Sequence, residues 1–292
     1  MDIFATITDR IIAALEQGTI PWHKPWTGGS HGCISYSTGK PYSLLNHLLL
    51  GGISGEYITF KQCSLAGGRI KKGEKSKMVV FWKPYETVDQ ETGEIEKHFY
   101  LRYFNVFHLS QCEGIAPRWT VSVTQPASDL QPDAAADAII QGYKDRSGIT
   151  LRITESDRAY YQPSTDTVVV PQLNQYRKQE EFYSTIFHEL THSTGHHSRL
   201  DRITDIAAFG SHEYSKEELC AELGAAFLVN HCGLETETSF RNSAGYLQGW
   251  LKALQNDKRL IVSAAGAAER AVNLILNRKE GEPNDETDEQ GN

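Results

Sequence analysis

The segment His188-Glu189-Leu190-Thr191-His192 constrains this chain most, because it places two imidazoles and a carboxylate within five residues. Positions i and i+4 of an α-helix lie on one face, so His188 and His192 can bind a single Zn²⁺. Glu189 would then lie beside the ion, where it can take a proton from a water molecule that attacks a carbonyl. The segment therefore predicts a metallohydrolase helix, with a chance match to the spacing as the alternative.

The residues around this segment favour a helix. Apolar Phe182, Ile186 and Leu190 recur at intervals of four, and Gly195 follows the last turn. The two histidines then lie next to the apolar stripe. The sequence thus predicts that the metal site is buried.

Two carboxylates further along the chain are candidates to complete the site. A catalytic zinc usually takes three protein ligands and leaves one position to water. Glu218 and Glu222 stand at i and i+4 in a segment with helical periodicity. One can bind the metal while the other accepts a hydrogen bond from a ligand histidine, which fixes the tautomer of that histidine. Their spacing alone leaves both assignments open.

Other side chains are weaker candidates for the same site. His196 or His197 as third ligand would resemble a pattern that needs a Gly and then a His at fixed later offsets, and the chain lacks this combination. His212 or Tyr214 could donate a hydrogen bond to the oxyanion of a tetrahedral intermediate.

The charge of the chain is unevenly distributed. The net charge is −8, yet residues 1–117 are nearly balanced and residues 61–83 hold seven bases and one acid. Basic side chains that alternate with aromatic ones suit a groove for single-stranded nucleic acid, although a solubilising loop is the alternative. The candidate DNA-binding residues are Trp22, Trp26, Lys61, Arg69, Lys71, Lys72, Lys75, Lys77 and Trp82.

The pattern of helices and strands predicts an α+β fold with two domains. The Pro-rich stretch after residue 117 predicts a linker, and the acidic end predicts a disordered tail. The expected parts are a first domain at 1–117, a linker at 118–136, a second domain at 137–279 and a tail at 280–292. Expected helices cover 2–17, 44–50, 134–144, 215–232 and 263–277, and expected strands cover 78–82, 96–102, 103–108, 150–153 and 167–170.

The strand at 167–170 is also a candidate edge strand of the second domain. Such an edge can bind a substrate backbone by β-augmentation. An ordinary core strand is the alternative.

The remaining composition favours a cytoplasmic protein that does not enter a membrane. No apolar run reaches 18 residues, and the start lacks a basic segment followed by an apolar one. Five scattered cysteines without C-x-x-C pairs predict reduced thiols.

Several blocks resemble one known family, the ArdC-type antirestriction proteins. Residues 185–196, 199–202 and 217–223 resemble the zincin-like metallopeptidase domain of that family. Residues 18–26, 57–62, 67–75 and 103–108 are similar to its single-stranded-DNA-binding domain. The Glu218-Leu219-Cys220-Ala221-Glu222 pattern also looks like that of related Glu-zincins, in which the first Glu binds zinc.

The resemblance implies both a site and a biological role. His188, His192 and Glu218 would hold Zn²⁺, Glu222 would support a ligand histidine, and Glu189 would be catalytic; the same ligands accept Mn²⁺ or Co²⁺. The protein would bind single-stranded DNA entering a recipient cell during conjugation. It would also cut a protein substrate, with a component of a restriction system as the candidate.

Two other functions remain open. The protein could shield DNA by coating it, with a structural or vestigial zinc site. A role in priming DNA replication is disfavoured, because no G-x-x-x-x-G-K-[ST] loop is present.

Overall fold

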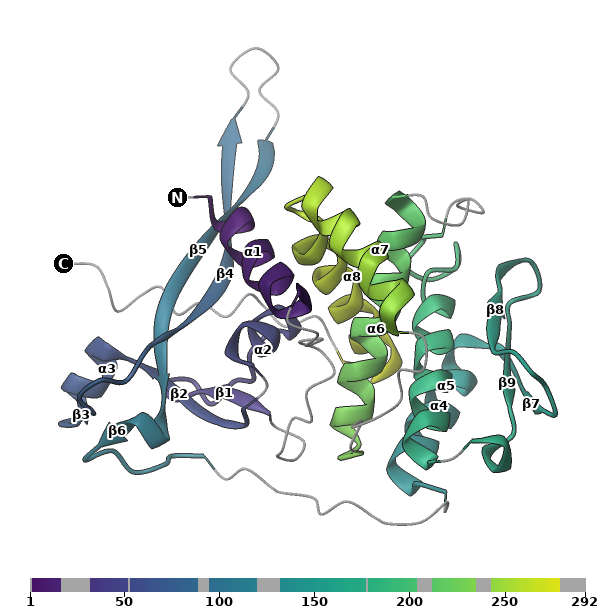
Figure 1. Cartoon of the computed structure of the whole chain (residues 1–292), viewed down its shortest axis with the longest axis horizontal. Coiled ribbons are helices and arrows are strands. Elements are labelled where there is room, and N and C mark those ends of the chain that lie inside the picture. Colours follow the sequence, from purple (N-terminus) through teal and green to yellow (C-terminus); the bar gives the residue numbers. More distant parts are fainter. Residues whose placement is uncertain are drawn as a thin grey trace.

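A computed structural model describes residues 2–16, 32–51, 53–88, 95–119, 132–176, 178–203, 212–234 and 243–278. For residues 83–88, 95–100, 212–214 and 243–249 only the backbone is described. Trp22, Trp26, most of the predicted linker and the predicted tail lie outside these residues. Mixed helices and sheets in two halves confirm the predicted α+β class (Figure 1).

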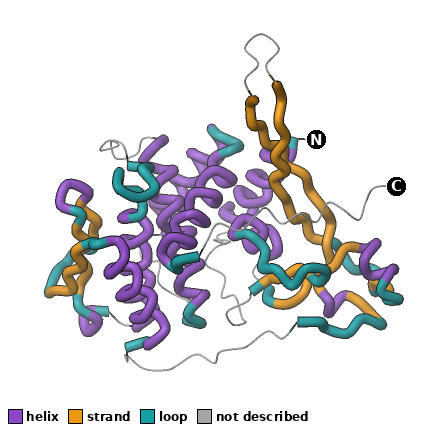
Figure 2. Tube along the Cα trace, turned by 180° about the vertical axis from the view of Figure 1, so that it is seen from behind, coloured by secondary structure: helices purple, strands orange, loops and turns teal. Residues whose placement is uncertain are grey.

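The N-terminal half is built on a four-stranded sheet with the order β1-β2-β5-β4. The strand β4 pairs with β5 over the full length of β4, and the two strands project from the body as an arm (Figures 1 and 2). The strands predicted at 96–102 and 103–108 are one continuous strand, β5. The elements are α1 (Ile3–Glu16), β1 (Cys33–Ser35), α2 (Leu44–Leu50), β2 (Gly55–Thr59), β4 (Lys77–Val88) and β5 (Ile95–His108).

A small unit of the N-terminal half carries most of the basic residues predicted to bind DNA. Helix α3 (Phe60–Leu65) starts at a capping box formed by Thr59 and Gln62. It is followed by β3 (Arg69–Ile70), which pairs antiparallel with β6 (Cys112–Glu113) beyond the short 3-10 helix Leu109–Gln111. This basic tip, residues 60–76 with β6, lies at the opposite end of the N-terminal half from the arm (Figure 1).

In its described residues, the C-terminal half combines five helices with a three-stranded sheet. Helix α7 and strand β8 were not predicted from the sequence. The elements are α4 (Ala134–Ser147), β7 (Thr150–Thr154), β8 (Tyr160–Gln162), β9 (Thr167–Pro171), α5 (Gln179–Ser193), α6 (His212–His231), α7 (Ser243–Asn256) and α8 (Leu260–Ile275), with 3-10 turns at Pro163–Thr165 and Leu173–Gln175.

The prediction that residues 167–170 form an edge strand is wrong. This segment is β9, the central strand of the order β7-β9-β8, with β7 parallel on one side and β8 antiparallel on the other. The backbone N–H and C=O groups on both sides of β9 therefore face neighbouring strands of the same sheet. The edge on the antiparallel side is the strand β8, which at three residues is too short to show an alternating pattern in the sequence.

The two halves share a hydrophobic core. One cluster joins Ile7 and Ile11 of α1 and Leu48 of α2 to Leu219 of α6 and Leu260 of α8. A second cluster lies within the C-terminal half, where α4, β9 and α5 pack on other faces of α6 and α8. Helices α6 and α8 thus contribute to both cores. None of the helices in the described ranges is long and apolar enough to cross a membrane.

Helix α2 links the arm to the C-terminal half. The side chain of Asn46 donates to the carbonyl of Val80 on β4 at 2.8 Å and accepts from the Val80 N–H at 2.7 Å. The next residue, His47, accepts from the N–H of Cys33 at 3.3 Å and stacks on Phe227 of α6, with 6.0 Å between ring centroids. Two consecutive side chains therefore contact opposite halves.

Burial of His47 predicts that stability depends on pH. Burial lowers the pKa of this imidazole from 6.5 to about 4. Between these values the unfolded chain binds more protons than the folded one, so stability rises with pH through this window and is lost as the pH falls through it.

We expect His47→Gln, which keeps a hydrogen-bond acceptor, to lower thermal stability near pH 7 but to flatten its acid dependence. The wild type should lose about 2 kcal/mol more than the variant between about pH 7 and about pH 4.5. Thermal unfolding across this range measures the difference. Equal slopes for the two proteins would contradict the assignment.

Candidate metal centre

The candidate site lies between two packed helices, α5 and α6. Gly224 of α6 faces Thr191 of α5 so closely that a Cβ on Gly224 would lie 2.7 Å from the threonine side chain. The Thr191 hydroxyl turns back and donates to the Phe187 carbonyl at 2.7 Å. Glycine is therefore needed at this contact, which brings the carboxylates of α6 opposite the histidines of α5.

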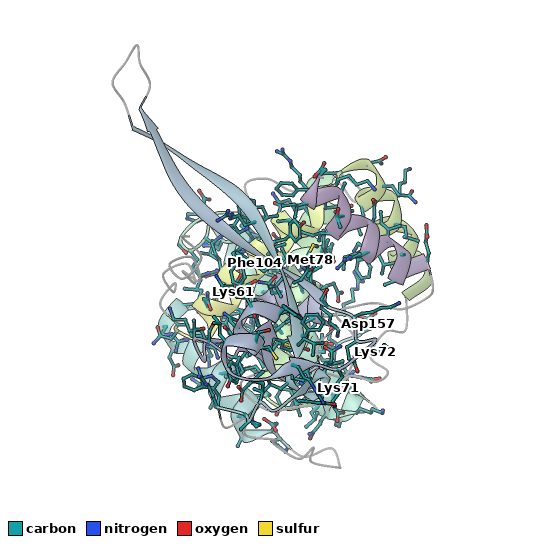
Figure 3. The ribbon with its side chains drawn as sticks, turned by 90° about the vertical axis from the view of Figure 1, so that its left-hand side faces the viewer. Lys61, Lys71, Lys72, Met78, Phe104 and Asp157 are labelled. Atoms are coloured by element: carbon teal, nitrogen blue, oxygen red, sulfur yellow. The ribbon has the colours of Figure 1, made fainter. Side chains whose placement is uncertain are left out.

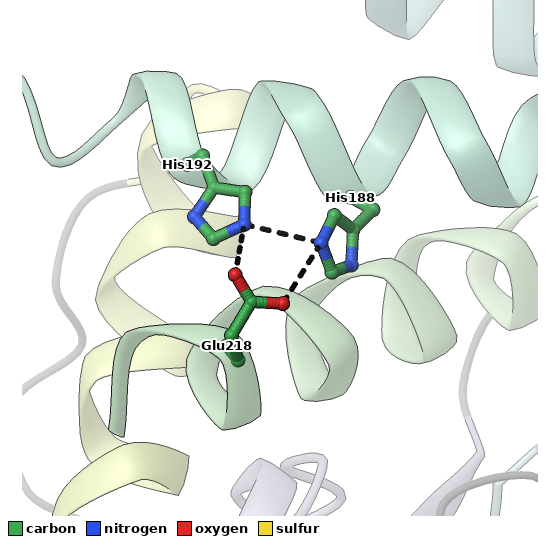
Figure 4. A group of neighbouring side chains, drawn as sticks. All are labelled: His188, His192 and Glu218. Atoms are coloured by element: carbon green, nitrogen blue, oxygen red, sulfur yellow. Dashed lines mark hydrogen bonds and ion pairs between the residues drawn. The ribbon is translucent and has the colours of Figure 1, made fainter. Parts of the chain in front are cut away.

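Three side chains point their donor atoms at one position (Figure 4). The Nε2 atoms of His188 and His192 lie 3.1 Å apart. The Glu218 carboxylate oxygens lie 3.7 Å from Nε2 of His188 and 3.6 Å from Nε2 of His192. Ligands about 2.1 Å from a tetrahedral metal lie about 3.4 Å from one another, so this donor set fits a divalent ion.

The other ring nitrogens of both histidines face carboxylates. Nδ1 of His192 hydrogen-bonds Glu217 at 3.1 Å, and Nδ1 of His188 lies 3.5 Å from Glu222. A carboxylate at Nδ1 keeps the proton on that atom and leaves Nε2 free to bind a metal. Of the two assignments open from spacing, this geometry favours Glu218 as ligand and Glu222 as the partner of His188.

Glu217 is paired on its second side by Arg202. The guanidinium donates from Nε at 2.9 Å to one carboxylate oxygen and from an outer nitrogen at 2.8 Å to the other. Burial raises the pKa of Glu217, but hydrogen bonds from His192 and Arg202 outweigh burial and lower it to about 2. The ion pair is therefore kept at neutral pH.

The two histidines differ in charge preference. Burial lowers the pKa of His188 to about 4. Burial also acts to lower the pKa of His192, but the hydrogen bond to Glu217 and the nearby carboxylates raise it to about 9. Without a cation, the carboxylates around His192 thus favour its protonated form.

Glu189 lies beside the three donors and is almost fully buried. Burial raises the pKa of its carboxyl to about 7, against the opposing effects of His192 and of a hydrogen bond from the Tyr161 main chain. Tyr161 is the central residue of β8. The edge strand therefore faces the predicted catalytic carboxylate.

Sequence reasoning missed several parts of this site. The contact of Glu217 with His192 depends on how the two helices cross, and Arg202 had no assigned role. His196 and His197 lie in the turn after α5, and the three-residue donor group found among the described residues does not include them. The side chains of His212 and Tyr214 fall outside the described part of the chain.

Part of the predicted DNA-binding set lies on the basic tip. Lys61, Lys72 and Lys75 are exposed. Arg69 pairs with Glu113 at 2.6 Å, and the Lys71 ammonium donates to the Ser110 carbonyl at 2.6 Å. Figure 3 views the molecule from the side that carries the basic tip. Lys71 and Lys72 are close together in this view, and Lys61 lies apart from them.

The other two described candidates lie away from the tip. Lys77 is half-buried and its ammonium donates to the Leu50 carbonyl at the end of α2. Trp82 is 43% exposed on the arm, where its ring lies 5.9 Å from that of Phe4 in α1. The structure therefore does not gather the predicted residues into one patch.

Comparison with known proteins identifies the family of this chain. A family described as zincin-like metallopeptidase matches residues 134–267, and one described as the N-terminal domain of anti-restriction factor ArdC matches residues 1–107. The crystal structure of antirestriction ArdC from plasmid R388, in its metal-free form, matches with 33% identity and a TM-score of 0.76, covering 96% of this chain and all of that one. This chain belongs to the ArdC antirestriction family. The predicted family and two-part architecture are confirmed.

A second ArdC structure bears on the metal. The Mn(II)-bound form of R388 ArdC matches with a TM-score of 0.75 and 33% identity, over 95% of this chain and 98% of that one. The homologue thus binds a divalent ion, in line with the donor set of His188, His192 and Glu218.

The chain is also similar to parts of longer proteins. A DNA primase TraC of Escherichia coli is 33% identical over an alignment of 309 positions, which covers 97% of this chain and 28% of that protein. The chain spans about a quarter of that relative. A Sinorhizobium fredii protein named y4eC is 30% identical, over 94% of this chain and 91% of its own length.

The geometry predicts how metal affinity changes at the two carboxylates of α6. Loss of a residue that hydrogen-bonds a metal ligand typically weakens metal binding about 10- to 100-fold. We expect Glu218→Gln to weaken Zn²⁺ and Mn²⁺ binding by more than this. Glu222→Gln should fall within that smaller range. Competition with a metal chelator measures both constants, and a larger loss for Glu222→Gln would reverse the assignment.

Proposed function

We propose that this protein is a divalent-metal-dependent peptidase that also binds single-stranded DNA. In this role it protects DNA entering a recipient cell during conjugation, and its protein substrate is a component of the restriction system. The observation that carries the peptidase is the convergence of His188, His192 and Glu218, with Glu189 beside them and an edge strand facing Glu189. Zinc is the proposed ion, since two imidazoles and a carboxylate suit it.

The side chains of the site divide the chemical work. A divalent ion held by His188, His192 and Glu218 would polarise a peptide carbonyl and make a water molecule more acidic. Glu189 would remove a proton from the attacking water and return it to the leaving amine nitrogen. Burial raises the pKa of the Glu189 carboxyl, which makes it a stronger base than an exposed carboxylate.

The edge strand β8 is the proposed position of the substrate backbone. Strand β8 ends the sheet order, and its central residue directs its main-chain N–H toward Glu189. A peptide that pairs with β8 would lie beside Glu189 and the three metal donors. An extended segment of the target protein is therefore the proposed substrate form.

The Glu189→Gln variant tests the proposed chemistry. It should bind Zn²⁺ within a few-fold of wild type, because Glu189 is not a proposed ligand, and lose peptide hydrolysis by at least about 100-fold, the lower range for general-base catalysis. Metal content and cleavage of restriction-system proteins, with and without single-stranded DNA, are the measurements. Normal cleavage by the metal-loaded variant would refute the role of Glu189.

The exposed lysines of the basic tip support DNA binding. Lys61, Lys72 and Lys75 are exposed on the basic tip, which also includes Phe60; this side chain is 64% exposed and can stack on a base. Replacing the three lysines by Ala should weaken binding. The slope of log affinity against log salt concentration should become shallower by about 0.7 for each phosphate that a lysine no longer neutralises.

A matched control replaces three exposed lysines of the other half by Ala: Lys178, Lys216 and Lys252. This variant has the same net charge as the tip variant, so it separates a local effect from the effect of overall charge. Equal losses of DNA binding in the two triple variants would contradict a DNA-binding role for the basic tip.

A second function, protection by coating alone, is favoured by the same exposed basic tip. In that case the metal site would be structural or vestigial. Transfer of a plasmid into a restricting host distinguishes the two functions. Loss of protection in Glu189→Gln supports proteolysis, whereas full protection in Glu189→Gln, with loss in the lysine variant of the tip, supports coating.

A further inference from the structure

Two arginines with largely buried side chains lie three residues apart in the loop that follows α5. The loop is held by its own backbone, since Arg199 N–H donates to the His196 carbonyl at 2.9 Å and Arg202 N–H to the Gly195 carbonyl at 3.0 Å. Both guanidinium groups also bind the last turn of α5: Arg199 donates to the Ser193 carbonyl at 2.8 Å and Arg202 to the Thr191 carbonyl at 3.0 Å. Cations suit this end of a helix, where carbonyls are unpaired.

Arg202 contacts Glu217, the hydrogen-bond partner of the metal donor His192. Its side chain is 13% exposed, and its two-pronged contact holds both oxygens of Glu217. A third nitrogen donates to the Thr194 hydroxyl at 2.8 Å. Because Glu217 in turn holds Nδ1 of His192, the guanidinium fixes the plane of the carboxylate that orients this histidine.

Arg199 reaches the edge strand instead. Its side chain is 7% exposed and binds both oxygens of Asp166, at 2.9 and 2.5 Å. The Tyr161 hydroxyl donates to the same carboxylate at 2.8 Å and lies 3.3 Å from the guanidinium. Asp166 adopts a left-handed backbone, with φ 46°, in the turn between β8 and β9. This strained position keeps its carboxylate between Arg199 and Tyr161.

We propose that Arg199 and Arg202 are separate positioning residues for the two parts of the site. Arg202 acts through Glu217 to orient His192 toward the metal. Arg199 acts through Asp166 and Tyr161 to hold β8 at a fixed place beside Glu189. The inference rests on the proposed metallopeptidase function, because it assigns one arginine to metal binding and the other to the strand that would carry the substrate.

Lysine variants separate the two roles, because a lysine keeps the charge but cannot make a two-pronged contact. Arg202→Lys should weaken Mn²⁺ and Zn²⁺ binding about 10- to 100-fold, as expected for an outer partner of a ligand histidine, and leave hydrogen exchange of residues 160–162 unchanged. Arg199→Lys should speed exchange of these residues about 10-fold or more through local opening, and leave metal affinity within about 2-fold.

Two further variants and a control keep the test independent of folding defects. Glu217→Gln should follow the Arg202→Lys pattern, and Asp166→Asn the Arg199→Lys pattern. Arg158→Lys is the control, since Arg158 is exposed, lies next to β8 in sequence and only approaches Asp157 at 3.7 Å; it should change neither quantity. Thermal unfolding of each variant measures global stability.

The two readouts also separate this inference from the proposed function. If both arginine variants changed metal affinity and exchange in parallel, or if neither changed its assigned quantity, the inference would be overturned. Neither measurement needs a substrate. A wild type that binds metal but cuts no protein would therefore count against the peptidase and leave the positioning roles standing.

Discussion

The close contact of α5 and α6 is the constraint on which the rest of the site depends. His188 and His192 stand one turn apart on α5, and Glu218 stands on α6, so no single helix can assemble the donor set. Gly224 allows the helices to approach within reach of one another's side chains at Thr191. Close packing in the core then transmits any change at this contact directly to the donor distances.

Charge balance explains why a cation belongs at this contact. Glu189, Glu217, Glu218 and Glu222 all lie around the two histidines, and Arg202 pairs with Glu217. Buried carboxylates repel one another and lose hydration, which is costly unless positive charge is close. A divalent ion would offset this excess of negative charge, and the raised pKa values of His192 and Glu189 are the response of the side chains alone.

The position of α6 also ties the metal site to the N-terminal half. One face of α6 packs with α1 and α2, while another packs with α5. Through Asn46 and His47, α2 contacts both the root of the arm and Phe227 of α6. The halves are thus joined through a common core as well as through the chain. Helix α6 therefore packs on the N-terminal half and also carries the metal donor Glu218.

The sequence by itself determined the parts whose signal is local. Helical spacing placed His188, Glu189 and His192 on one face, and periodicity located α1, α2, α4 and α5 within a few residues. Only the tertiary structure decided that Glu217 and Arg202 meet at His192, that β8 rather than β9 is the edge strand, and that Lys77 turns inward while Lys72 stays exposed. These outcomes depend on how helices cross and strands pair, which is set by packing between residues far apart in the chain.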